Sequence, residues 1–341
     1  LSMEELLLRG GSNLPVAFLD IKKAFPSVRR SSLLRALHNM GFEGAIWKVI
    51  HGMYEDNTSH VVVGDSQSTE YSVDNGIREG AILSPLLYII FVNELLDRIR
   101  QSRQGCHYKG VSAAALAYAD DLALIGQPQH YDKSGSQLQG LLDICDAFAK
   151  EHMFNFGFKK TKVIIFSPDR PADVTWTLAS MVDPPPNTED PYTLEQVTEY
   201  TYLGLRFSAD LKWNAHVNSI VLPGCAAVLG RLKGHLTSHD MLSPKTAMMI
   251  IRSLAVSKFK YGCAIWATDL FGSRSTPHTR LTKSNWESIE EVFNQAFYKI
   301  LDLPPHANHI AIFKELGWGS LNFVVAKSKL GLFQKIASLN T

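Results

Sequence analysis

Two short apolar segments that flank an acidic pair constrain the fold of this chain more than any other feature. The segments are Ala113–Tyr118 and Leu122–Ile125, and Asp120 and Asp121 stand between them. Apolar runs of this length around a short polar break predict a tight β-hairpin. Both carboxylates are therefore expected at the tip of the hairpin, held by two rigid strands.

A third acidic residue, Asp20, directly follows the apolar run Val16–Leu19, which predicts a short buried strand. If this strand and the hairpin are neighbours in one sheet, three carboxylates meet at one place. Carboxylates so close together raise one another's pKa, because their negative charges repel, and a divalent cation relieves this repulsion. Carboxylate oxygens favour Mg²⁺ or Mn²⁺. Two such ions about 3.5–4 Å apart can hold the attacking and leaving oxygens of a phosphoryl transfer.

The three carboxylates are not expected to contribute equally. Adjacent residues in a strand point to opposite faces of the sheet, so we assign the main ligand role to Asp120 rather than to Asp121. Taken singly, an Asp at a strand end is more often a turn or helix-cap residue than a metal ligand. The prediction of a metal site therefore depends on the three residues coming together.

The remaining pattern predicts a mixture of helices and strands. Helices are expected over residues 30–40, 43–54, 85–101 and 137–151, strands over 163–166, 174–178 and 200–207, and a hairpin over 59–64 and 69–73. Ser84 is expected to cap the third helix, with Pro85 in its first turn. The order of these elements predicts an α+β fold in which helices pack on one face of an antiparallel sheet.

Two further regions differ in character. The proline- and acid-rich segment 168–191 predicts a loop-rich insertion. From His216 onward the chain is expected to be mostly helical, with a polar break at 271–282.

Charge is unevenly distributed along the chain. The formal net charge is only +1, yet residues 200–341 carry 16 Lys and Arg against 8 Asp and Glu. This basic part could hold a phosphate backbone by counterion release, or be the solvated surface of lysine-rich helices. Both interpretations stay open at this point.

The cysteine pattern and the hydropathy bear on location. The four cysteines form no Cys-x-x-Cys pair, so neither a zinc site nor a disulfide framework is indicated. No unbroken apolar run reaches the ~20 residues of a membrane span. We expect an intracellular chain, nuclear or cytoplasmic and not secreted, without a membrane partner.

Six segments of the chain resemble motifs of reverse transcriptases. They are Ala17–Val28, Gly76–Tyr88, Ala117–Leu124 with its Tyr-Ala-Asp-Asp box, Phe158–Val163, Tyr200–Gly204 and Tyr261–Trp266. The first four resemble palm motifs, the fifth resembles a primer-grip segment, and the last is similar to a segment after the thumb in non-LTR (LINE-type) retrotransposons. The resemblance implies a right-hand polymerase palm with partial fingers over 1–205, followed by a helical thumb and C-terminal extension over 206–341.

The resemblance implies roles for residues that match these motifs. Asp20, Asp120 and Asp121 would be catalytic carboxylates that hold two Mg²⁺ or Mn²⁺ ions, with the backbone carbonyl of Ile21 touching a metal. Lys160 would protonate the leaving pyrophosphate, although a solvated surface lysine explains it as well. The substrates implied are an RNA template, a DNA primer and deoxynucleoside triphosphates.

Further residues would bind the nucleotide and the primer. Phe25 stands where the family places a steric gate against a 2′-hydroxyl, although the sequence alone favours a core aromatic residue on the first helical turn. Gly76 and Gly80 would let the backbone approach the nucleotide. The nucleotide-binding set is Phe25, Gly76, Glu79 and Gly80, and the primer-binding set is Tyr202, Leu203 and Gly204, which a buried strand edge explains too.

Several positions depart from the family pattern. Glu79 stands where Gln is usual, and an acidic side chain there would repel a triphosphate unless it is protonated or turned away. Gly157 stands where Asn is usual. Asp20 lies 19 residues after the first residue, Leu1, whereas the family has a long fingers segment upstream. The chain is therefore expected to be a piece of a longer reading frame, in which an endonuclease domain could stand upstream.

Three functions compete on this basis. The first is the RNA-directed DNA polymerase core of a non-LTR retrotransposon. The second is a truncated relic, catalytically weak or inactive, that acts at most as a nucleic-acid-binding scaffold. The third is a group II intron maturase, which shares the Tyr-Ala-Asp-Asp box, but the Ile77–Gly80 and Tyr261–Trp266 segments fit non-LTR elements better. An RNA-dependent RNA polymerase is less expected, because its box usually carries Gly before the two Asp residues.

Overall fold

The computed structural model divides the chain into two compact units, Leu1–Thr198 and Glu199–Thr341. The division falls before Glu199, earlier than the boundary at 205 that the motif pattern suggested. The structure describes residues 13–108, 111–127, 135–166, 174–182, 191–236, 243–267, 281–304 and 307–338. Most of the predicted loop-rich insertion at 168–191 and of the polar break at 271–282 lies outside these residues.

A five-stranded sheet forms the centre of the first unit, in the order β15–β11–β1–β9–β8. Its strands are β1 (Leu14–Asp20), β8 (Ala115–Tyr118), β9 (Asp121–Ile125), β11 (Lys162–Phe166) and β15 (Glu195–Gln196). All neighbouring strands are antiparallel except β11 and β15, which run parallel. The central strand β1 is apolar and almost wholly buried, and it pairs along both of its edges, with β9 and with β11.

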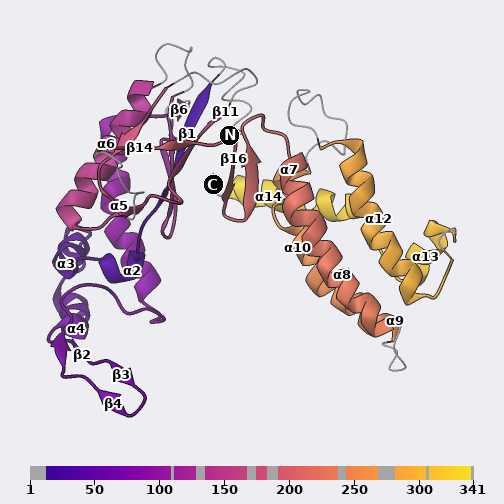
Figure 1. Ribbon diagram of the computed structural model, residues 1–341, viewed down its shortest axis with the longest axis horizontal. Coiled ribbons are helices and arrows are strands. Elements are labelled where there is room, and N and C mark those ends of the chain that lie inside the picture. The colour runs from indigo at the N-terminus through magenta and orange to yellow at the C-terminus, as the bar shows by residue number, and fades with distance from the viewer. Residues whose placement is uncertain are drawn as a thin grey trace. The chain divides into compact units, whose positions relative to one another are not determined.

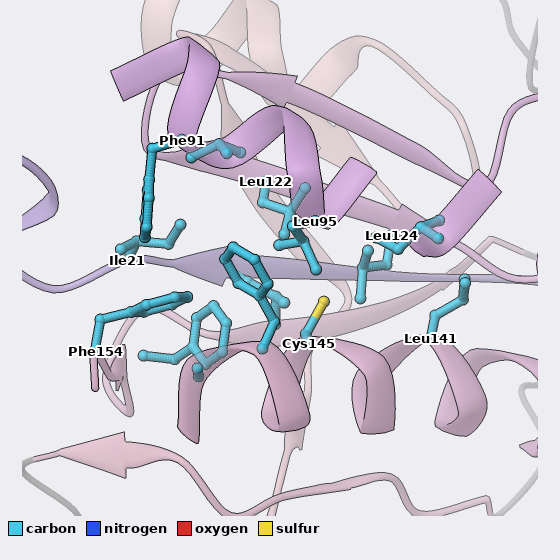
Figure 2. Packing of buried hydrophobic residues seen from close by; sticks show 14 of the residues in the cluster. Ile21, Phe91, Leu95, Leu122, Leu124, Leu141, Cys145 and Phe154 are labelled. Atoms are coloured by element: carbon cyan, nitrogen blue, oxygen red, sulfur yellow. The ribbon is translucent and has the colours of Figure 1, made fainter. Parts of the chain in front are cut away.

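Two long helices pack on one face of this sheet, as Figure 1 shows for α5 (Ser84–Ser102) and α6 (Gly135–His152). Leu141 and Cys145 of α6 point toward Leu122 and Leu124 of β9, with Leu95 of α5 between the layers (Figure 2). Fully burying a side chain of this size stabilises the folded state by about 1.5–3 kcal/mol. The predicted sheet with helices on one face is confirmed, and it is antiparallel except for the parallel pair of β11 and β15.

The helices and strands before α5 also follow the predicted pattern. They are α2 (Ala24–Ser27), α3 (Arg30–Asn39), α4 (Gly44–Tyr54), β2 (Thr58–Ser59), β3 (Val62–Val63), β4 (Ser66–Gln67) and β5 (Tyr71–Ser72). β2 pairs with β5 and β3 with β4, so the predicted hairpin is present as two short ladders. The remaining short strands of this unit are β6 (His107–Tyr108), β7 (Val111–Ser112), β10 (Phe156–Gly157), β12 (Thr177–Leu178), β13 (Met181–Val182) and β14 (Tyr192–Thr193).

The predicted cap of α5 is wrong in detail. Leu83 occupies the N-cap position and makes no side-chain hydrogen bond to the helix. The Ser84 hydroxyl instead donates to the backbone carbonyl of Arg78 at 2.5 Å. Ser84 therefore fixes the loop that precedes the helix, and Pro85 stands in the first turn as expected.

The second unit begins with a hairpin and continues as helices. The hairpin is β16 (Glu199–Tyr202) and β17 (Leu205–Ser208), which corrects the single strand predicted over 200–207. The helical elements are α7 (Asn214–His216), the π-helix η1 (Val217–Val221), α8 (Leu222–Leu236), α9 (Pro244–Ile250), the π-helix η2 (Ile251–Ala255), α10 (Val256–Lys260), α11 (Cys263–Trp266), α12 (Lys283–Ile300), α13 (His309–Glu315) and α14 (Leu321–Ser338). The predominantly helical character expected after His216 is confirmed.

One helical stretch, Asn214–Leu232, is long and apolar enough on average to cross a membrane by length and composition. Five residues of this stretch belong to the core of the second unit: Val217, Val221, Cys225, Leu229 and Leu232. Their spacing of three or four residues is that of a helix with one buried face. Packing within this unit therefore accounts for the apolar composition of the stretch.

Candidate active site

The end of β1 and the tip of the β8–β9 hairpin lie side by side, as the sequence predicted. In the antiparallel register of β1 and β9, Asp20 stands directly opposite Asp121. Residues opposite each other in such a pair point to the same face, with Cβ atoms about 4.5–5.5 Å apart. The carboxylates that share a sheet face are thus those of Asp20 and Asp121, whereas strand alternation in the sequence predicts the main ligand role for Asp120.

Asp120 lies in the turn of the hairpin rather than in a strand. The preceding residue, Ala119, adopts a left-handed conformation with φ of 54°, which costs on the order of 1 kcal/mol for a residue with a Cβ. This conformation closes the turn tightly between Tyr118 and Asp121, which pair across the hairpin. Asp120 lines a cavity of about 170 Å³ together with Ala24, Phe25, Glu79, Tyr88 and Ala119.

The three carboxylates interact electrostatically. Burial raises the pKa of Asp121, and the charges of Asp120 and then Asp20 raise this pKa further. The Lys160 ammonium lies 3.1 Å from Asp20 Oδ1. Its hydrogen bond with Asp20 raises the pKa of Lys160, which keeps this lysine protonated. The Lys160 ammonium is thus a cation beside the three carboxylates. Bound divalent ions would further relieve the repulsion among these carboxylates.

The backbone holds Asp20 in place through the fourth motif. The amide of Asp20 donates to the hydroxyl of Thr161 at 3.3 Å, and Thr161 is buried. Beyond the end of β1, Ile21 forms a bridge with Phe156, and the amide of Lys22 donates to the carbonyl of Asn155. The sequence did not single out Thr161, because a threonine between two lysines carries no signal of its own.

Gly157, a departure from the family pattern, is explained by this crowding. A Cβ at this position would lie 2.5 Å from Asp20 Oδ2 and 2.7 Å from Cε of Lys22. Real Cβ atoms do not approach other atoms so closely. Any larger residue at 157 would therefore displace the Asp20 carboxylate or the Lys22 stem.

The two glycines of the second motif have different surroundings. Gly76 has φ of +87°, and a Cβ on it would lie 2.9 Å from the backbone oxygen of Pro26. Its amide donates to the carbonyl of Val28, and its carbonyl accepts a hydrogen bond from Nε of Arg30. Gly76 thus packs against the chain around α2. Gly80 has φ of +78° with open space around its Cβ position, which leaves room for a ligand to approach its backbone.

The predicted steric-gate residue lies next to the acidic hairpin. Phe25 contacts Tyr88 edge to face, with ring centroids 5.4 Å apart, and both line the cavity that Asp120 closes. Glu79 lines the same cavity and is exposed.

The predicted primer-binding residues form the turn of the β16–β17 hairpin in the second unit. Leu203 and Gly204 have φ of 48° and 74°, the left-handed pair that a two-residue hairpin turn requires. The hydroxyl of Tyr261 donates to the carbonyl of Leu203 at 2.6 Å. A Cβ on Gly204 would lie 3.2 Å from the Tyr261 ring. Two segments that sequence analysis treated separately, 200–204 and 261–266, thus form one structural element.

Another acidic cluster in the first unit is closed by arginine. Ligand atoms of Glu94, Glu151 and His152 lie within 4.8 Å of one another. The Arg98 guanidinium lies 2.5 Å from Glu94 and 2.7 Å from Glu151, and its hydrogen bond lowers the pKa of Glu151. Because Arg98 supplies the positive charge, this cluster needs no metal ion.

We expect Asp121→Asn to stabilise the metal-free protein at neutral pH. A raised carboxyl pKa means that the folded chain binds a proton more readily than the unfolded chain. Stability therefore falls as pH rises from the ordinary Asp pKa of about 3.9 through the raised value. The variant lacks this cost, so its Tm should exceed that of the wild type by about 1–3 °C at pH 7 and by nothing at pH 4. If the variant had a lower Tm than the wild type at pH 7 without divalent ions, repulsion among the three carboxylates would be contradicted.

Comparisons with known proteins agree with this geometry. The sequence profile of the family described as reverse transcriptase (RNA-dependent DNA polymerase) matches residues 3–207. The Retrovirus-related Pol polyprotein from type-1 retrotransposable element R2 of Popillia japonica is 26% identical over 208 residues, which are 58% of this chain and 32% of that protein. The probable RNA-directed DNA polymerase from transposon BS of Drosophila melanogaster is 23% identical over 300 residues, which are 88% of this chain and 30% of that protein. The chain thus spans about a third of the length of these relatives.

Solved structures of telomerase are loosely similar. The apo telomerase of Candida tropicalis has a TM-score of 0.46 at 12% identity, and the match covers 91% of this chain and 45% of that one. The relatives identified by sequence come from R2, jockey and other non-LTR retrotransposons, and the family profile covers more than half of the chain. This chain belongs to the reverse transcriptase (RNA-dependent DNA polymerase) family.

Proposed function

We propose that this chain is the catalytic core of an RNA-directed DNA polymerase of a non-LTR retrotransposon. The observation that carries the proposal is the pairing of Asp20 with Asp121 across β1 and β9, with Asp120 in the adjoining turn. Three carboxylates on rigid strands suit hard divalent cations, and reverse transcriptases generally use divalent metal ions. The substrates proposed are a DNA primer, an RNA template and deoxynucleoside triphosphates.

The residues of the cluster would hold two ions, Mg²⁺ or Mn²⁺, through the carboxylates of Asp20, Asp120 and Asp121 and the backbone carbonyl of Ile21. When bound, such ions lower the pKa of a primer 3′-hydroxyl and neutralise charge on a triphosphate. The hydrogen bond from Lys160 to Asp20 supports a cationic lysine at the edge of the site, where it could donate a proton to the departing pyrophosphate. Phe25 would exclude a 2′-hydroxyl through its ring.

The direct test is extension of a DNA primer on an RNA template by the purified chain. We expect extension with deoxynucleotides that depends on added Mg²⁺ and stops with EDTA. Binding of the primer–template without any extension, in Mg²⁺ and in Mn²⁺, would overturn the polymerase and favour the second candidate, a nucleic-acid-binding relic. The exposed Glu79 in the cavity beside Asp120 favours that candidate, because two acidic groups repel a triphosphate.

The location and the domain context are part of the same proposal. The four free cysteines are all buried, which suits a reducing, intracellular compartment, nuclear or cytoplasmic. Because the chain spans about a third of its relatives, an upstream endonuclease domain in the parent polyprotein is proposed as well.

We expect Tyr261→Phe to weaken primer binding selectively. The change removes the hydroxyl that donates to Leu203 and leaves the ring against Gly204. A hydrogen bond of this kind contributes about 0.5–1.5 kcal/mol, so the KM for primer–template should rise about 3–10-fold, while the KM for the nucleotide stays unchanged. Steady-state kinetics at varied primer–template concentration measures this effect. The same change at Tyr298, a buried residue of α12, serves as the control, and equal effects of both variants would contradict a specific role of Tyr261.

A further inference from the structure

Tyr88 of α5 carries a buried hydroxyl that has no hydrogen-bond partner among the residues that the structure describes. The residue is 1% exposed. An unpartnered buried hydroxyl is costly, because it loses its hydrogen bonds to water and gains nothing in exchange. Such groups are rare in folded proteins, and a bound ligand is one of the causes that explain them.

The side chain of Tyr88 lines the cavity beside Asp120. The cavity has a volume of about 170 Å³, far more than the 10–15 Å³ that admits a single water and less than the 300–1,000 Å³ of a site for a whole small molecule. It therefore suits one part of a larger ligand. The ring of Tyr88 packs edge to face against Phe25, which lines the same cavity.

The lining of the cavity indicates which part of a nucleotide fits. Its acidic groups are Glu79 and Asp120, and none of the described residues that line it is basic, so it would repel a phosphate group. Ala24, Phe25 and Ala119 supply apolar surface. A sugar ring combines apolar carbon with hydroxyl groups and carries no charge. A 2′-deoxynucleoside triphosphate has a single free hydroxyl on its sugar, at the 3′ position.

We propose that the Tyr88 hydroxyl hydrogen-bonds the 3′-hydroxyl of the incoming deoxynucleotide and so selects nucleotides that can be extended further. The inference rests on the proposed function and adds a specificity-determining residue to it. The partner that the hydroxyl lacks in the free protein is then the substrate. Burial and the nearby charge of Asp120 raise the pKa of Tyr88, which keeps the phenol neutral and able to donate.

The test uses Tyr88→Phe, which removes the hydroxyl and keeps the ring. The chain is bound to a primer–template whose primer ends in a dideoxynucleotide, so that no chemistry occurs, and the Kd of dATP and of ddATP is measured with Mg²⁺ present. The wild type should bind dATP about 3–10-fold more tightly than ddATP, and the variant should bind both with the wild-type affinity for ddATP. The Tm of the free variant should rise by about 2–5 °C, because the uncompensated hydroxyl is gone.

Tyr54→Phe is the matched control, since Tyr54 is also buried in the first unit but does not line the cavity. It should leave both nucleotide affinities unchanged. An unchanged preference for dATP in Tyr88→Phe, or an equal loss of affinity for dATP and ddATP, would overturn the proposal. These binding measurements need no turnover. Failure of primer extension by the wild type would therefore count against the polymerase function alone and be distinguished from failure of the Tyr88 assignment.

Discussion

Replacing Asp120 by asparagine is expected to reduce the rate of primer extension about a thousandfold or more. The change keeps the size of the side chain and removes the negative charge in the turn between β8 and β9. A thousandfold loss corresponds to about 4 kcal/mol of transition-state stabilisation. This magnitude is expected when a group that supports charge at the reacting centre is removed. Single-turnover extension of an end-labelled primer measures the effect.

The control for this prediction is Asp97→Asn in α5. Asp97 pairs with Arg100 on the surface of the same unit and does not line the cavity beside Asp120. Its removal should leave extension within about twofold, because surface ion pairs contribute little. Both variants should bind primer–template as the wild type does. An Asp120→Asn chain that keeps more than a tenth of the wild-type rate would contradict the assignment of Asp120 to the catalytic cluster.

Replacing Gly76 by alanine is expected to destabilise the first unit by about 2–4 kcal/mol. The left-handed backbone at φ of +87° costs about 1–2 kcal/mol for a residue with a Cβ. The added Cβ would also stand 2.9 Å from the backbone oxygen of Pro26, which a flexible side-chain movement cannot relieve. The Tm of this unit should fall by roughly 5–15 °C. Thermal unfolding followed by circular dichroism measures the shift.

Gly80→Ala provides a matched comparison for Gly76→Ala. Gly80 has nearly the same φ, +78°, but its Cβ position is open. It should therefore show only the backbone cost of about 1 kcal/mol. Equal Tm shifts for the two variants would show that the contact with Pro26 contributes nothing. The comparison also separates two roles that the family resemblance had joined, because Gly76 supports the chain around α2 whereas Gly80 faces open space.

The acidic site could be predicted from the sequence because its signals are local. An apolar run that ends at Asp20 and a hairpin that carries Asp120 and Asp121 each follow from strand periodicity. Their adjacency followed from one assumption, that the two strands are neighbours, and the register of β1 and β9 confirms it. Which carboxylate stands opposite Asp20 depends on where the turn closes, and the unusual backbone of Ala119 decides this.

The remaining differences come from contacts between residues far apart in the chain. Leu203 is not a residue that favours a left-handed turn, so the sequence predicts one strand over 200–207. The distant Tyr261 hydroxyl and the φ of Gly204 support the turn instead. Likewise, Ser84 stands where the sequence predicts a helix cap, but its hydroxyl donates a hydrogen bond to the backbone carbonyl of Arg78. The sequence places Tyr88 at the end of the second motif, but periodicity cannot show that its hydroxyl lacks a partner.

The placement of Asp20 has a consequence for how this protein loses its active geometry. The residue ends β1, which pairs with β9 on one edge and with β11 on the other. Strands with neighbours on both edges open only when the whole unit unfolds, unlike frayed ends and mobile loops. Asp20 itself lies beyond Phe18, the last residue of β1 that pairs with β11, and Asp120 stands in the exposed turn of the hairpin. The central part of β1 is thus as long-lived as the folded unit, whereas the turn that carries Asp120 can move without unfolding it.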